Sequence, residues 1–145
     1  MNHINLTPYA ALMLRISLGV MFISHGLLKV FVFTLPGTAQ FFESVGFAGW
    51  MAYPVTVMEI AGGVLLILGV ATRWIALALI PVLLGALSVH SGNGWLYTNE
   101  NGGWEYAAFL TVAAIVQAML GSGAYALRPD VDRESQRISS QSLAS

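Results

Sequence analysis

The segment that decides the fold is residues 14–31, LRISLGVMFISHGLLKVF. It lies within a longer apolar run from about residue 9 to 33, and about 20 mostly apolar residues suffice for a helix to cross a bilayer. At 100° per residue, Arg15, His25 and Lys29 fall within one arc of this helix. Because unpaired charge is costly in hydrocarbon, that arc must face other helices. The segment therefore predicts the first helix of a membrane bundle.

The composition of the whole chain agrees with a membrane protein. The 145 residues are 57% hydrophobic and 9% charged, with a mean hydropathy of +0.72, whereas soluble domains carry about 25% charged residues. These values exclude a soluble enzyme and a disordered regulator. The formal net charge of -1 provides no basic footprint for nucleic acid. The lack of cysteine excludes disulfides, thiolate catalysis and iron–sulfur clusters.

Three further apolar segments predict helices at about 54–71, 74–90 and 104–120. We therefore expect an all-α membrane protein, a bundle of four transmembrane helices within residues 1–127. Tryptophan and tyrosine residues lie near the expected helix ends, where aromatic belts form. Residues 128–145 are polar and serine-rich without apolar periodicity, so we expect a disordered cytoplasmic tail there.

The basic residues indicate how the bundle is oriented. Arg73 lies in the expected turn between the second and third helices, and three arginines between residues 128 and 137 follow the fourth. With Arg15 they place five basic residues on the side of both termini, against Lys29 on the other side. The positive-inside rule therefore predicts cytoplasmic termini, and we expect a bacterial cytoplasmic (inner) membrane. Arg15 itself is expected to snorkel toward that side or to anchor packing.

Two connections on the opposite side are longer than a turn requires. In residues 34–53, three apolar side chains fit one face of a short interfacial helix, which we expect Thr38 to cap. Residues 91–104 contain two Asn-Gly pairs and predict a turn-rich or hairpin-like cap. The longer connections are thus all expected on the outer side.

Each expected helix places an ionisable side chain in the same outer leaflet. Ionisable groups within membrane helices usually pair with one another or line a site. Because all four expected helices carry such a residue in the same leaflet, we expect these side chains to lie close together. The set consists of His25 and Lys29 on the first helix, Glu59 on the second, His90 at the end of the third and Glu105 at the start of the fourth.

Each member of this set also has a purely structural explanation. Lys29 could snorkel to the interface. His90 and Glu105 lie at helix ends whose dipoles favour their charges. Glu59 could belong to a structural ion pair, and His25 could be a satisfied core histidine.

The same set suits a quinone, whose two carbonyls need hydrogen bonds and protons. Lys29 would stabilise the negative charge that develops on such a ring. The residues expected to handle protons are His25, Glu59, His90 and Glu105. The residues expected to form apolar walls are Phe22, Met58, Trp95 and Trp104. The histidines and carboxylates also match a metal-ligand set. A haem between His25 and His90 has no further support, because the sequence lacks Cys-x-x-Cys-His.

The sequence shows no electron carrier of its own. It has no cysteine, no P-loop and no Gly-x-Gly-x-x-Gly after a strand. We therefore expect redox work to need a partner protein or a bound cofactor.

Four blocks carry a resemblance to a known family. They are residues 14–31, residues 58–73 (MEIAGGVLLILGVATR), the region of His90, and residues 102–109 (GGWEYAAF). Over about residues 14–123 the chain resembles the DoxX family of small four-helix membrane proteins. The resemblance places all five ionisable residues on the family's recurring polar positions. It implies an oxidoreductase-type subunit associated with a quinol oxidase or thiosulfate:quinone system, or a role in oxidative stress or quinone detoxification.

These observations favour a membrane subunit of a redox system that binds a quinone or similar small aromatic in an outer-leaflet pocket. We expect it to contact the lipid bilayer and to work with a redox-protein partner or as a homo-oligomer. A non-enzymatic accessory or assembly subunit is the first alternative. A proton-coupled small-molecule carrier is the second.

Overall fold

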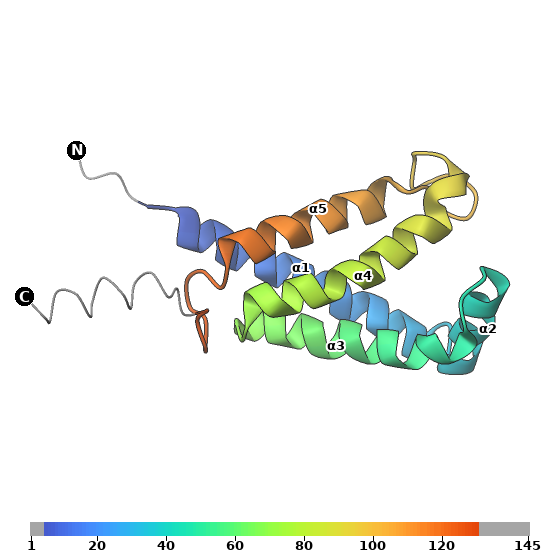
Figure 1. Cartoon of the computed structure of the whole chain (residues 1–145), viewed down its shortest axis with the longest axis horizontal. Coiled ribbons are helices and arrows are strands. Elements are labelled where there is room, and N and C mark those ends of the chain that lie inside the picture. The colour runs from blue at the N-terminus through green and yellow to red at the C-terminus, as the bar shows by residue number, and fades with distance from the viewer. Residues whose placement is uncertain (1–4, 131–145) are drawn as a thin grey trace, which may run out of the picture.

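Helices make up nearly all of the regular structure in residues 5–130, the part of the chain that the computed structural model describes (Figure 1). No strand occurs in this range apart from an isolated bridge between Val70 and Arg128. The helices are α1 (Thr7–Phe31), α2 (Leu35–Ser44), α3 (Ala52–Leu68), α4 (Thr72–His90) and α5 (Glu105–Leu120), with short 3-10 turns η1 (Gly49–Met51) and η2 (Ser91–Asn93).

The prediction of an all-α membrane bundle is confirmed. The four long helices expected from the apolar runs are α1, α3, α4 and α5, and their bounds differ from the predicted ones by at most three residues. The first three, taken with their flanking 3-10 turns, are long and apolar enough to cross a membrane, whereas α5 is a shorter apolar helix of 16 residues. Pro8 near the start of α1 and Gly69 (φ 70°) after α3 suit a helix start and a helix stop.

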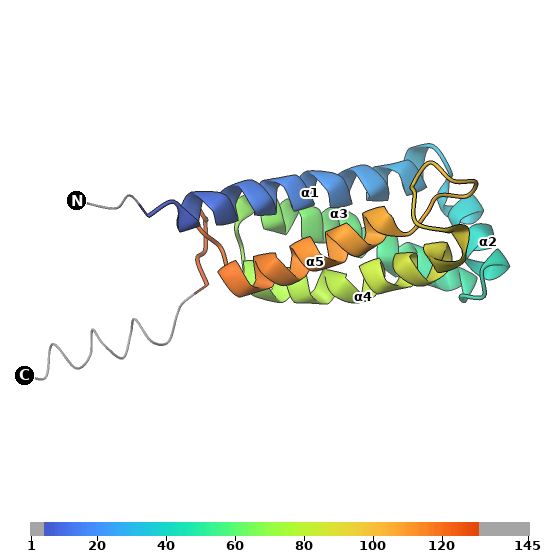
Figure 2. The same ribbon diagram turned by 90° about the horizontal axis from the view of Figure 1, so that it is seen from above.

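The bundle has two unlike ends (Figures 1 and 2). At one, which we call the termini end, lie the start of α1, the α3–α4 turn and residues 121–130. At the other, which we call the loop end, lie α2 and residues 91–104. The longer connections therefore gather at one end, as the sequence predicts.

Helix α2 begins earlier than predicted. Its N-cap is Thr34, whose Oγ1 accepts a hydrogen bond from Gly37 N at 3.2 Å. Thr38 is therefore not the cap; it is buried in the helix and donates through Oγ1 to Thr34 O at 2.9 Å. The reason is Pro36, which is favoured in the first turn of a helix and moves the start toward Leu35.

Close approach of α1 to α3 depends on glycine. A Cβ on Gly19 would lie 2.7 Å from Gly63 O and 2.6 Å from Ile67 Cγ1. Such contacts leave no space for a larger residue, so the small residues let the two backbones pack directly. Beside this contact, Leu18 and Leu66 belong to a buried apolar cluster that extends into α4 and α5.

Arg15 anchors the termini end. Its side chain is 1% exposed and donates to the carbonyls of Ser122 at 2.8 Å, Ala124 at 3.0 Å and Tyr125 at 3.1 Å. The snorkelling interpretation is therefore wrong and the anchoring interpretation is correct. Backbone carbonyls on a returning segment accept from both Nη atoms of the guanidinium, so these atoms need not reach water.

The segment after α5 continues along the other helices at the termini end. Leu127 N donates to Leu68 O at 3.0 Å, and Arg128 N donates to Gly69 O at 3.3 Å. Asp130 Oδ2 accepts from Arg73 N at 3.3 Å, at the start of α4. Of the tail expected at 128–145, residues 131–145 lie outside the described part of the chain.

Candidate functional site

A charged pair joins α1 to α3 toward the loop end. Lys29 Nζ donates to both carboxylate oxygens of Glu59, at 2.8 Å to Oε1 and 2.7 Å to Oε2. The Lys29 side chain is 18% exposed and the Glu59 side chain 7% exposed. Each charge therefore compensates the other in a region where an unpaired charge would be costly.

Gly26 allows this pair to form. A Cβ at that position would lie 2.5 Å from Ile60 Cγ1 and 3.4 Å from Glu59 Cβ. Without one, α3 packs against α1 closely enough for the Glu59 carboxylate to reach Lys29. Thr38 of α2 also donates to Lys29 O at 3.4 Å, so α2 lies beside the pair.

His25 lies one turn before Lys29 on α1. Its Nδ1 is 2.8 Å from Met21 O. Its ring stacks on that of Tyr106 from α5, with centroids 5.8 Å apart and an interplanar angle of 28°. Tyr106 Oη lies 3.6 Å from Met21 Sδ and donates to it.

We refer to His25, Lys29, Glu59 and Tyr106 as the polar cluster. Three helices supply it: α1, α3 and α5. The cluster offers a cation, a carboxylate, an imidazole and an aromatic face within one region of the bundle. Such a combination can transfer protons, balance developing negative charge and hold a planar ring.

His90 and Glu105 are engaged elsewhere, in residues 91–104. His90 Nδ1 donates to the carbonyls of Asn101 at 3.0 Å and Gly102 at 3.1 Å, taking each carbonyl as the acceptor. Glu105 Oε1 accepts from Tyr97 N at 2.9 Å. The structure thus brings together three of the five predicted ionisable residues. The other two hold a turn-rich loop, which contains no strand between residues 91 and 104.

The predicted apolar walls are distributed over the molecule. Phe22 is 4% exposed and belongs to the buried core, whereas Met58 is 37% exposed on α3. Trp95 and Trp104 pack edge to face on each other, with centroids 4.5 Å apart, within the loop. Of these four, Met58 directly precedes Glu59 on α3, and Phe22 lies about one turn before His25 on α1.

A metal site is not built within residues 5–130. No three histidine or acidic side chains in that range are grouped so that they could hold an ion. Both described histidines also engage backbone carbonyls through Nδ1.

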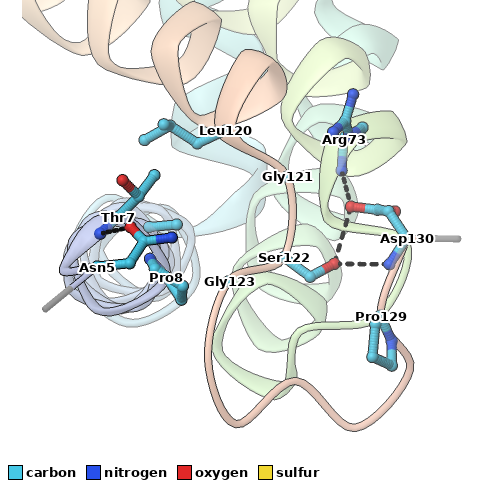
Figure 3. A pocket seen from close by; sticks show the side chains of 11 residues that line it. Asn5, Thr7, Pro8, Arg73, Leu120, Gly121, Ser122, Gly123, Pro129 and Asp130 are labelled. Carbon is cyan, nitrogen blue, oxygen red and sulfur yellow. Dashed lines mark hydrogen bonds between the residues drawn. The ribbon is translucent and has the colours of Figure 1, made fainter. Parts of the chain in front are cut away.

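Sequence reasoning missed Tyr106 and the cavity at the termini end. The signal for Tyr106 is its place beside Glu105, in the same leaflet as His25. The cavity, of about 290 Å³, lies between the start of α1 and residues 121–130 (Figure 3). Its polar rim includes Asn5, Arg73 and Asp130, whose Oδ2 accepts from Ser122 Oγ at 2.8 Å. In the sequence of residues 121–130, the only signal for this segment is its turn-favouring residues Gly121, Gly123 and Pro129.

Comparisons with known proteins agree with the membrane bundle. The DoxX family model matches residues 10–91, more than half of the chain. This match spans α1 to α4 and includes His25, Lys29 and Glu59. A protein of Bacillus subtilis (strain 168) named "Putative oxidoreductase CatD" is 36% identical over 120 residues, which cover 83% of this chain and 85% of that protein. No solved structure matches. The chain is thus an integral membrane protein that belongs to the DoxX family.

Proposed function

We propose that the polar cluster binds the ring of a quinone, its quinol or a similar small aromatic, and that the chain is the membrane subunit of a redox system. The observation that carries this proposal is the buried Lys29–Glu59 pair beside the stacked rings of His25 and Tyr106. The similarity to the protein named "Putative oxidoreductase CatD" supports the redox assignment.

The four side chains would divide the chemistry between them. The Lys29 ammonium stabilises negative charge on a ligand oxygen, because it is a cation in a region of low dielectric constant. The Glu59 carboxylate and the His25 imidazole take up or return the protons that accompany reduction and oxidation of the ring. Tyr106 provides an aromatic face. The two electrons are exchanged with a redox-protein partner.

The energetics of a buried ion pair favour a role beyond packing. Desolvation of the two charges offsets most of their attraction, and apolar residues of similar volume often hold two helices at least as well. The Lys29–Glu59 pair is therefore an inefficient way to attach α1 to α3. Its charges are better explained by a ligand that uses them.

We propose the bacterial inner membrane as the location, with both termini in the cytoplasm. Arg15, Arg73 and Arg128 all lie at the termini end, whereas Lys29 lies toward the loop end. The positive-inside rule supports this orientation. It would expose the loop end, and the nearby polar cluster, to the outer leaflet.

The direct test is a ligand search on the purified protein in mild detergent. An absorption spectrum and mass spectrometry of extracted small molecules should detect a bound quinone or related aromatic. Glu59→Gln should lower its occupancy at least about tenfold, because the neutral amide no longer balances Lys29 or accepts a proton. Helix content, measured by circular dichroism, should be retained.

An accessory subunit is the second candidate, and it is favoured by the hydrogen bonds with which the chain already satisfies Lys29 and Glu59. In that case no ligand would co-purify or bind on titration with a quinone. Glu59→Gln would then lower only the unfolding temperature. This pair of results would contradict the proposed ligand site.

A further inference from the structure

We infer that Tyr106 is a positioning residue, which together with Met21 O holds the His25 ring so that Nε2 accepts a hydrogen bond from a ligand hydroxyl. The inference rests on the proposed function, because it concerns the same ligand. It deepens that function by assigning a donor–acceptor direction to one contact and a role to a residue of α5.

The first step is the protonation of the His25 ring. A carbonyl oxygen can only accept a hydrogen bond, so the 2.8 Å contact with Met21 O requires the proton on Nδ1. In a neutral imidazole the other nitrogen is then a bare acceptor. No hydrogen bond joins Nε2 to another residue between 5 and 130. Nε2 is therefore available to a ligand that carries O–H.

The second step is the orientation of the ring. The ring can still rotate about its two side-chain torsions within the range that the hydrogen bond to Met21 O allows. The Tyr106 ring, 5.8 Å away and inclined by 28°, lies along one face and restricts that rotation. The Oη of Tyr106 in turn donates to Met21 Sδ at 3.6 Å, so the same turn of α1 holds both rings. Tyr106 thus controls where Nε2 points.

The third step is the route by which a ligand reaches the ring. Tyr106 is 38% exposed, and it comes from α5, which lies alongside α1. The stacked rings therefore stand at the seam between these helices, where an apolar ligand could approach from the lipid. Lys29 and Glu59 lie on the α3 side of α1. A ring placed at the seam would therefore lie beside the stacked His25 imidazole.

The experiment compares two probes that differ at their oxygens. We would titrate 2,3,5-trimethylhydroquinone and its dimethyl ether into the full chain in nanodiscs, without oxygen and at pH 8. The wild-type protein should bind the diol at least about tenfold more tightly than the ether, because the ether leaves the Nε2 acceptor unpaired. The steric effect of the methyl groups is removed by comparing the diol-to-ether ratio between variants.

Tyr106→Leu should reduce this ratio at least about threefold, because the imidazole loses the face that restricts it. Tyr106→Phe keeps the ring and should restore most of the ratio. His90→Gln is the matched control, since His90 has the same Nδ1-to-carbonyl contacts outside the polar cluster; its ratio should equal that of the wild type. An unchanged ratio in Tyr106→Leu would overturn the positioning role.

A second measurement needs no variant of Tyr106. ¹⁵N NMR of histidine-labelled protein, assigned with His3→Gln and His90→Gln, should show the His25 proton on Nδ1. A proton on Nε2 instead would overturn the inference and leave the proposed function standing. If neither probe binds the wild-type protein, both the inference and the proposed function fail.

Discussion

Helix α1 buries one cation toward each end of the bundle, and the two have different partners. Arg15 at the termini end is held by three backbone carbonyls, whereas Lys29 toward the loop end is held by the Glu59 carboxylate. A guanidinium does not lose its proton in proteins, and a carbonyl has none to exchange. An ammonium–carboxylate pair can exchange protons with a ligand. The first arrangement can only hold the fold together, and the second can also do chemistry.

The largest expected effect is on the stability of the termini end. Arg15→Met should lower the free energy of unfolding by about 4 kcal/mol, because three buried or partly buried carbonyls lose a charged donor together. Unfolding by SDS titration, followed by circular dichroism, would measure it. A loss below about 1 kcal/mol would show that residues 121–125 do not depend on Arg15.

A smaller loss in the free energy of unfolding is expected at the Lys29–Glu59 pair. Glu59→Gln should cost about 2 kcal/mol, because Lys29 is left without its counter-charge. The double variant Lys29→Gln with Glu59→Gln should recover about half of this loss, because no unpaired charge remains. The same SDS titration applies. A double variant less stable than the single one would mean that the pair stabilises the fold in its own right.

The packing that brings the pair together can be tested at Gly26. Gly26→Ala should cost about 1.5 kcal/mol, because its Cβ would lie 2.5 Å from Ile60 Cγ1. Gly85→Ala on α4 is the matched control, since a Cβ there meets nothing within 4 Å. It should stabilise the protein by about 0.5 kcal/mol through helix propensity. Equal effects of the two substitutions would contradict the close α1–α3 contact.

The smallest expected effect is in the loop between α4 and α5. Glu105→Gln weakens a charge-assisted hydrogen bond from Tyr97 N and should cost about 0.5 kcal/mol. Hydrogen exchange should accelerate within residues 94–104 and stay unchanged in α1. A loss of ligand binding in this variant would contradict the placement of Glu105 outside the ligand site.

Most of the fold could be predicted from apolar runs and helix geometry. A helix has a fixed period, so the polar arc of α1 and its charged groups follow from the sequence alone. The start of α2 was predicted too late, at Thr38, because Pro36 in the first turn favours a start at Leu35. Length and hydropathy of the apolar runs were enough to predict the four long helices.

The site was only partly predictable. The pattern placed all five ionisable residues in one leaflet, where such groups were expected to pair or to line a site. The partners of Arg15, His90 and Glu105 are backbone groups in connecting segments, which leave no trace in side-chain patterns. The stack of His25 on Tyr106 depends on how α5 crosses α1, which residue spacing within one helix does not report.

The contrast between the two buried cations offers the most direct test. Binding of a short-chain quinone in nanodiscs, measured by calorimetry, should be compared between Arg15→Lys and the double variant Lys29→Gln with Glu59→Gln. We predict that Arg15→Lys lowers stability but keeps wild-type affinity, whereas the double variant keeps most of its stability and loses at least about tenfold in affinity. Wild-type affinity in the double variant would contradict a ligand-binding role for the Lys29–Glu59 pair.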